Sequence, residues 1–199
     1  VIKTGAKVVF FFILPIIYIR YILKEKILDF LNIKTIDMRR LQVGFLFGLA
    51  SALIIVVTFI IAKDFINTDK IITDLNERLQ ITPEVYIFIA LYITFGNSLL
   101  EEFYFRGFIF LKFYQANYKT LGYLFSALLF AIYHVAIFAT WFNIWLILLA
   151  LLGLFIVGII FNWLNTKSNN FLNSWILHIM ADIAVVSIGY YLFQTTLTN

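Results

Sequence analysis

Six ionisable residues lie inside stretches of the sequence that are otherwise apolar. They are Glu101, Glu102, Arg106, His134, His178 and Asp182. A charged side chain at membrane depth costs about 3 kcal/mol on insertion scales, and those that are kept usually face the interior of a helix bundle and carry function. Carboxylates combined with imidazoles are the groups of general acid–base catalysis and of catalytic metal sites. The set therefore indicates a polar site within a membrane protein.

The two adjacent glutamates point in different directions if their stretch is helical, because neighbours on a helix differ by about 100°. Glu102 can pair with Arg106 one turn further on, and we interpret this pair as structural. Glu101 has no basic residue three or four positions away in either direction. Its carboxylate is therefore predicted to find a partner on another helix or to serve as a base.

The elements that carry these residues are predicted to be transmembrane helices. The chain is 63% hydrophobic and only 13% charged, which is far from the composition of soluble domains. Runs close to the ~20 residues that cross a bilayer predict an all-α, polytopic transmembrane bundle of about six spans, with room for extra interfacial or broken helices. The predicted spans are 8–23, 41–62, 84–111, 121–139, 141–164 and 171–193.

Charges in the connections predict how the spans are oriented. Basic residues concentrate in the first, third and fifth connections, so these face the cytoplasm and both termini face away from it, although Lys3 and Lys7 argue against this. The polar segment 67–82 is predicted to be an amphipathic helix at the outer interface. Its apolar positions are Ile71, Ile72, Leu75 and Leu79. No basic patch with interleaved aromatic residues indicates a nucleic-acid partner, and the absence of cysteine excludes thiol catalysis.

The two histidines of the chain lie in separate predicted spans, and His178 shares a helix face with Asp182 four residues later. At a rise of ~1.5 Å per residue, Glu101, both histidines and Asp182 all lie roughly 10 to 20 Å from the predicted cytoplasmic ends of their spans. A single buried histidine such as His134 is often only a hydrogen-bonding residue between helices. The shared depth of all these groups instead favours one polar cavity, because each uncompensated group would make insertion worse.

Three short motifs follow one another in the sequence. They read Glu101-Glu102-x-x-x-Arg106, Phe130-x-x-x-His134 and His178-x-x-x-Asp182. In order and spacing they resemble the signature motifs of the CPBP (Abi) intramembrane proteases, a family that includes the type II CAAX prenyl endopeptidases and bacterial proteins of bacteriocin processing or immunity. The resemblance covers about residues 86–188. The third motif more often ends in asparagine in that family, whereas Asp182 stands here.

The resemblance implies hydrolysis of a peptide bond in a membrane-associated protein or peptide, with Glu101, Glu102, Arg106, His134, His178 and Asp182 as the site residues. It implies that residues 84–199 form the catalytic core, after two spans and an outer interfacial segment in 1–83. The expected location is a bacterial plasma membrane, with the site toward the cytoplasm. The expected partners are the lipid bilayer and a substrate with a membrane-proximal cleavage site, either a prenylated C-terminus or a peptide precursor.

Two versions of the chemistry remain open. In the one we favour, no cofactor is needed: Glu101 activates water, and His134 holds that water or shares its proton. His178, kept protonated and oriented by Asp182, donates a hydrogen bond to the oxyanion. In the alternative, a zinc ion is bound by Glu101, His134, His178 and Asp182. No H-E-x-x-H helix is present for that purpose.

Two other classes of function remain as alternatives. One is a catalytically silent membrane scaffold or bacteriocin-immunity protein of the same fold, for which replacing Glu101 by alanine would leave the phenotype intact. The other is a proton-coupled transporter or channel that uses the same acids and histidines as a relay. The sequence shows no inverted halves and no paired broken helices, which are typical of transporters.

Overall fold

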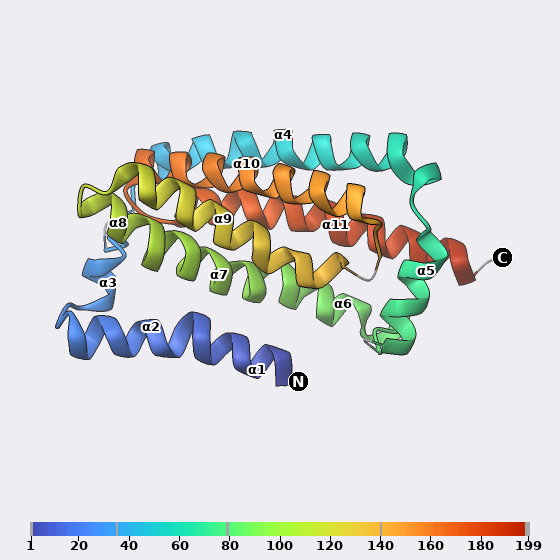
Figure 1. Cartoon of the computed structure of the whole chain (residues 1–199), viewed down its shortest axis with the longest axis horizontal. Helices are drawn as coiled ribbons and strands as arrows, with labels where there is room; N and C mark the ends of the chain where they lie inside the picture. The colour runs from blue at the N-terminus through green and yellow to red at the C-terminus, as the bar shows by residue number, and fades with distance from the viewer. Residues whose placement is uncertain (1, 35, 79, 140, 198–199) are drawn as a thin grey trace.

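A computed structural model describes residues 2–34, 36–78, 80–139 and 141–197. Every element in these ranges is a helix, which confirms the all-α fold class (Figure 1). Within the described residues, five helices are long and apolar enough to cross a membrane. They are Thr4–Ile22, Met38–Phe65, Pro83–Gln115, Ile144–Ser168 and Leu172–Thr195. The protein is therefore an integral membrane protein.

The first and third long helices are built from α-helical segments joined by π-helical turns. The first contains α1 (Ile2–Val8), η1 (Val9–Ile13), α2 (Leu14–Ile17) and η2 (Tyr18–Ile22), and α3 (Ile27–Phe30) and α4 (Met38–Ala62) follow. A 3-10 turn, η3 (Lys63–Phe65), ends α4. Then come α5 (Thr68–Thr73), η4 (Asp74–Arg78), α6 (Pro83–Leu91), η5 (Tyr92–Asn97), α7 (Ser98–Glu101), η6 (Glu102–Phe110) and α8 (Leu111–Gln115). The last three are α9 (Lys119–Phe138), α10 (Ile144–Ser168) and α11 (Leu172–Leu197), and α4, α10 and α11 are continuous α-helices.

Five of the predicted spans correspond to these five helices. The sixth predicted span, 121–139, falls on α9, whose apolar part Lys119–Val135 is shorter than the other spans. The predicted interfacial helix corresponds to α5 and η4. Ile72 on its apolar face is buried, and Leu79 lies outside the described residues.

Polar residues begin the helices at the connections. The side chains of Asp37, Asn67 and Asn143 accept hydrogen bonds from backbone amides in the first turns of α4, α5 and α10. These caps satisfy amide groups that a helix start leaves without a partner. Asn169 ends α10 with a φ of 57°, which lets the chain turn back directly into α11.

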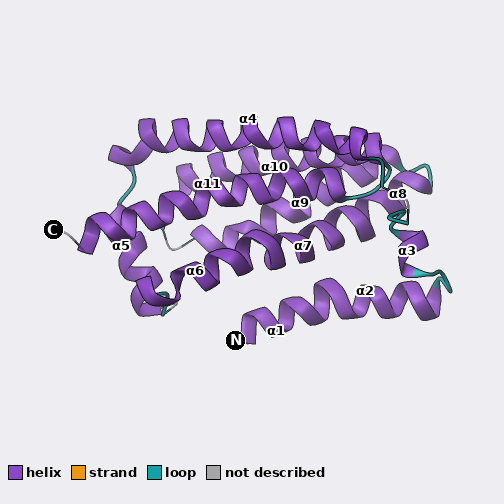
Figure 2. Cartoon of the chain, turned by 180° about the vertical axis from the view of Figure 1, so that it is seen from behind, coloured by secondary structure: helices purple, strands orange, loops and turns teal. Residues whose placement is uncertain are grey.

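Small residues let neighbouring helices approach closely. Gly44 of α4 lies against the backbone of Asn173, and Gly158 of α10 lies against Ala127 of α9. Figures 1 and 2 show α4, α10 and α11 on one side of the bundle, whereas the helix made of α1 and α2 runs along the opposite edge beside α7.

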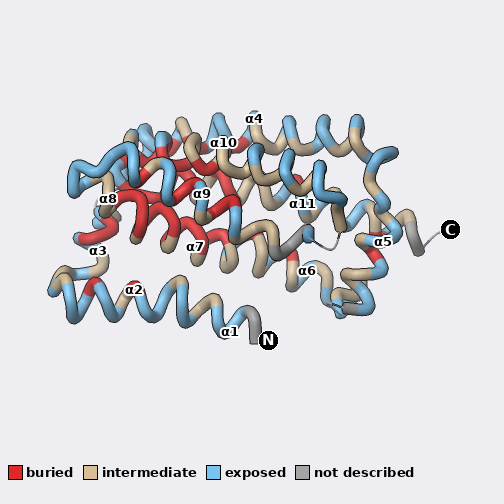
Figure 3. The backbone as a smooth tube through the Cα atoms, viewed as in Figure 1, coloured by how far each residue is buried: buried red, intermediate tan, exposed pale blue. Residues whose placement is uncertain are grey.

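Burial is concentrated where the chain carries its charges. Figure 3 shows buried residues gathered around α7, α8 and α9, while α4 is largely exposed outward. The segment η6 and the second half of α10 hold many of the buried residues. The exposed surface of α4 is apolar, as expected of a surface in contact with lipid. The interior therefore holds the buried charges among apolar side chains, and the outward surface of α4 is apolar.

Candidate active site

Three helices bring the predicted site residues together. Glu101 and Glu102 lie at the junction of α7 and η6, His134 lies near the end of α9, and His178 and Asp182 lie on α11. These helices pack against one another, with α9 and α11 both in contact with η6. The junction at Glu102 is also where the third span turns from α-helical to π-helical, and π-helical turns frequently occur at functional sites.

Glu101 lies between the two imidazoles. Its Oε2 atom is 3.5 Å from Nε2 of His134 and 3.9 Å from Nε2 of His178. The glutamate side chain is only 1% exposed, and Oε2 accepts no hydrogen bond from the residues that the structure describes. One oxygen of a buried carboxylate therefore faces both histidines without being committed to either.

His134 is held by the turn that precedes it. Its Nδ1 lies 2.8 Å from the carbonyl oxygen of Phe130, so Nδ1 carries the proton and donates it. The neutral ring then has its lone pair on Nε2, which is the atom that faces Glu101. The ring packs against Phe130, with centroids 4.4 Å apart. The four-residue spacing between Phe130 and His134 thus fixes both the tautomer and the direction of the histidine.

Glu102 contacts two partners through one oxygen. Its Oε1 accepts from Nη1 of Arg106 at 3.0 Å and from Nδ1 of His178 at 2.9 Å. The pairing with Arg106 is as predicted, and the bond to His178 is additional. Asp182, which was expected to orient His178, lies 3.7 Å from Nε2 of that ring. The residue that accepts a direct hydrogen bond from His178 is Glu102 instead. The sequence could not show this, because the two residues lie on different helices.

Arg106 is fully buried and surrounded by aromatic rings. Its guanidinium carbon lies 3.9 Å from the ring centroid of Phe130 and 4.7 Å from that of Phe161. Its Nε and Nη2 atoms have no hydrogen-bond partner within the described part of the chain. Cation–π contacts therefore stabilise the part of the charge that Glu102 does not.

Two residues at the site were not predicted from the sequence. Lys7 donates to Oε1 of Glu101 at 2.5 Å, and Asn97 donates to the same oxygen at 2.9 Å. Lys7 was assigned to the N-terminal flank of the first span, and nothing in its position indicates a contact with Glu101. The contact of Asn97 with Glu101 could have been predicted, since Asn97 lies four residues before Glu101 and so shares its helix face.

Apart from Lys7, the residues that form this site lie in a region of the chain that is similar to a known protein family. The model of the family described as type II CAAX prenyl endopeptidase Rce1-like matches residues 83–184, about half of the 199-residue chain. The chain belongs to this Rce1-like family. No curated protein and no solved structure matches it. The family assignment supports the resemblance to the CPBP intramembrane proteases, and the matched range includes every site residue that the sequence predicted.

A zinc ion at this Rce1-like site would need several donor atoms that are not already committed to other partners. Both histidines use Nδ1 for hydrogen bonds and leave Nε2 free, as zinc-binding histidines do. Oε1 of Glu101, however, already accepts from the ammonium group of Lys7. Among the described residues, no three histidine, aspartate or glutamate side chains are grouped so that they could hold a metal ion. The ammonium group of Lys7 therefore makes the Glu101 carboxylate a poor ligand for a second cation such as zinc.

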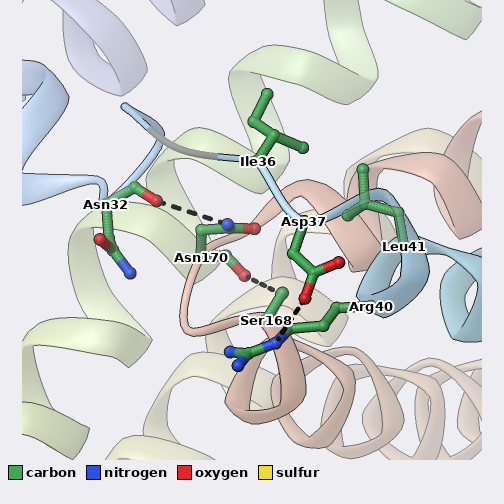
Figure 4. A pocket seen from close by; sticks show the side chains of 7 residues that line it. All are labelled: Asn32, Ile36, Asp37, Arg40, Leu41, Ser168 and Asn170. Carbon is green, nitrogen blue, oxygen red and sulfur yellow. Dashed lines mark hydrogen bonds and ion pairs between the residues drawn. The ribbon is translucent and has the colours of Figure 1, made fainter.

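A separate pocket of about 270 Å³ lies at the end of the bundle where α4 begins and α10 ends. It is lined by Asn32, Ile36, Asp37, Arg40, Leu41, Ser168 and Asn170 (Figure 4). Arg40 is paired with Asp37 at 3.1 Å, and both side chains are more than half exposed. None of the residues predicted for catalysis in this Rce1-like chain lines the pocket, so it is distinct from the candidate active site.

Proposed function

We propose that the protein is an intramembrane endopeptidase that uses Glu101 to activate the water that cleaves a membrane-associated protein or peptide. The observation that carries this proposal is the position of Oε2 of Glu101, which is buried, has no hydrogen bond among the described residues, and faces Nε2 of both histidines. A carboxylate in this position can accept a proton from water within reach of two further proton-handling groups. The membership of the chain in a peptidase family supports the same conclusion.

The reaction proceeds by one addition and one elimination. Glu101 accepts a proton from water through Oε2, and the hydroxide oxygen attacks the peptide carbonyl carbon. His134 holds the water through its Nε2 lone pair. His178 carries a proton on each ring nitrogen, and its Nε2 donates a hydrogen bond to the oxyanion. The proton on Glu101 is then transferred to the leaving nitrogen as the carbon–nitrogen bond breaks, which returns the carboxylate to its starting form.

Glu102 and Arg106 support this reaction without contacting the substrate. The bond from Nδ1 of His178 to Glu102 fixes the ring and stabilises its charged form, in which Nε2 has a proton to donate. The ion pair with Arg106 in turn fixes Glu102. Preorganised donors of this kind act strongly in a site that excludes water, because they need no reorganisation during the reaction.

The proposed substrate is a polypeptide whose cleavage site lies at the membrane. The family is described as a CAAX prenyl endopeptidase, so a prenylated C-terminal peptide is the first substrate to test, and an unprenylated peptide precursor is the second. We place the site toward the cytoplasmic side of a bacterial plasma membrane, because the basic connections of the chain are expected on that side.

The test is cleavage of fluorogenic prenylated and unprenylated peptides by the purified protein in liposomes. Glu101→Gln is expected to lower kcat by at least about 100-fold, the usual contribution of a general base. Glu84→Gln is the matched control, because Glu84 is exposed at the start of the same long helix and is expected to leave kcat unchanged. Full activity of the Glu101→Gln protein would contradict the proposal. A phenotype in cells that survives this substitution would support the scaffold alternative.

A further inference from the structure

We propose that Lys7, on the first span, is a positioning residue for the glutamate base, so that the active site includes a helix outside the matched family region. The inference rests on the proposed function, since it assigns Lys7 a role through Glu101. The family match begins at residue 83, whereas Lys7 lies in α1. The group that holds the base is therefore supplied by a part of this chain that the family match does not include.

The contacts of Lys7 are those of a buried ion pair. Its Nζ lies 2.5 Å from Oε1 of Glu101 and also donates to Oδ1 of Asn97. The Lys7 side chain is 8% exposed and that of Glu101 is 1% exposed. The ammonium group lies 4.8 Å from the ring centroid of Tyr133, on the helix that carries His134. A lysine is rarely buried to this degree unless it is paired, so its position is set by the carboxylate.

These contacts divide the two oxygens of Glu101 between two tasks. Oε1 accepts from Lys7 and from Asn97, and Asn97 is itself held by Lys7. The three side chains form a closed set of hydrogen bonds that fixes the rotation of the carboxylate. Oε2 is consequently the oxygen that faces the imidazoles. Without Lys7, only the Asn97 amide would hold Oε1, and the carboxylate could rotate away from the position in which Oε2 reaches the water.

Lys7 is not needed to attach the first span to the bundle, because other contacts do so. Phe11 stacks on Tyr104 with ring centroids 4.3 Å apart, and its ring also lies 5.1 Å from that of Tyr133. After the span, Glu25 pairs with Lys112 at 3.0 Å. These contacts keep the helix beside α7 and η6, and they leave Lys7 to act on Glu101.

The first experiment measures kcat and KM of Lys7→Met with the peptide that the wild-type protein cleaves. We expect kcat to fall about 10- to 100-fold, because a catalytic group misplaced by about 1 Å loses activity on this scale. KM is expected to change less than about 3-fold. Lys7→Arg keeps the charge and is expected to recover at least part of kcat. Lys112→Met is the matched control, because it removes an ion pair between the same N-terminal region and the third long helix, away from Glu101. A kcat for Lys7→Met within twofold of wild type would overturn the inference.

The second experiment needs no substrate. Melting temperatures are measured for wild type, Lys7→Met, Glu101→Gln and the double variant. Each single change leaves one buried charge of the ion pair without its opposite charge and the double change removes both charges, so the loss in the double variant is expected to be smaller than the sum by about 2 to 4 °C. Additive losses would overturn the inference. If the two substitutions are coupled but the wild-type protein cleaves no peptide, the proposed function is contradicted and Lys7 is only a structural partner of Glu101.

Discussion

The Nδ1 atom of His178 lies 2.9 Å from Oε1 of Glu102, and Nη1 of Arg106 lies 3.0 Å from the same oxygen. The two adjacent glutamates therefore face different partners. Glu102 links an arginine of its own helix to a histidine of α11, and Glu101 turns toward Lys7 and the Nε2 atoms of both imidazoles. Adjacent residues on a helix face different directions, which lets one acid orient the site while its neighbour remains available for chemistry.

This relationship predicts that Glu102 matters more to His178 than Asp182 does. Glu102→Gln removes the charged acceptor of the Nδ1 proton, and we expect kcat to fall by at least about 100-fold, as it does when a preorganised donor is lost. Asp182→Asn alters a group 3.7 Å from Nε2 and keeps a polar side chain of the same size, so kcat is expected to stay within about tenfold. The kcat values of the two variants, measured in the same peptide-cleavage assay, decide which residue matters more to His178. The reverse order would show that Asp182 is the orienting acid.

The ion pair between Glu102 and Arg106 predicts a large effect on stability. Arg106→Met leaves the carboxylate of Glu102 buried with one partner fewer, and we expect a loss of about 3 to 5 kcal/mol in the free energy of unfolding. Unfolding in detergent micelles measures this quantity. Arg40→Met is the control, because the pair of Arg40 with Asp37 is more than half exposed and contributes about 0 to 1 kcal/mol. Equal losses in the two variants would contradict the buried role of Arg106.

Two glycines of α10 give a matched test of how the helices pack. A Cβ at Gly158 would lie 2.9 Å from Cα of Ala127 in α9, whereas a Cβ at Gly153 would meet nothing within 4 Å. Gly158→Ala is therefore expected to lower the free energy of unfolding by about 1 to 3 kcal/mol, because α9 has to move. Gly153→Ala is expected to raise it by up to about 1 kcal/mol through helix propensity. Melting curves of both variants check the prediction, and a stabilised Gly158→Ala protein would show that α9 and α10 are farther apart.

The poor fit of the site to zinc predicts that activity survives chelation. Purified protein is incubated with a strong chelator, and the chelator is then removed. We expect the protein to cleave its peptide at an unchanged rate, because Glu101 is the proposed base and Lys7 already supplies the cation beside it. Elemental analysis of the same sample gives the metal content. Stoichiometric zinc, with activity lost to the chelator and restored by zinc, would establish the metal alternative.

Several features could be predicted because they depend on local sequence. The spans follow from apolar runs of the length that a bilayer needs, and the pair of Glu102 with Arg106 follows from four-residue spacing. The expectation that Glu101 needs a partner on another helix also followed from spacing, because no basic residue lies one turn away. The catalytic roles of these residues remain predictions for the experiments above.

The sequence alone determined that this is an all-helical membrane protein with acids and imidazoles inside its apolar segments, since hydropathy and helical periodicity are properties of each segment by itself. The tertiary structure decided which groups meet. It placed Lys7 on Glu101 and Glu102 on His178, across 94 and 76 residues of chain. Such pairings depend on how whole helices pack and rotate against one another, and that is set by contacts along their full length rather than by the residues near any one charge.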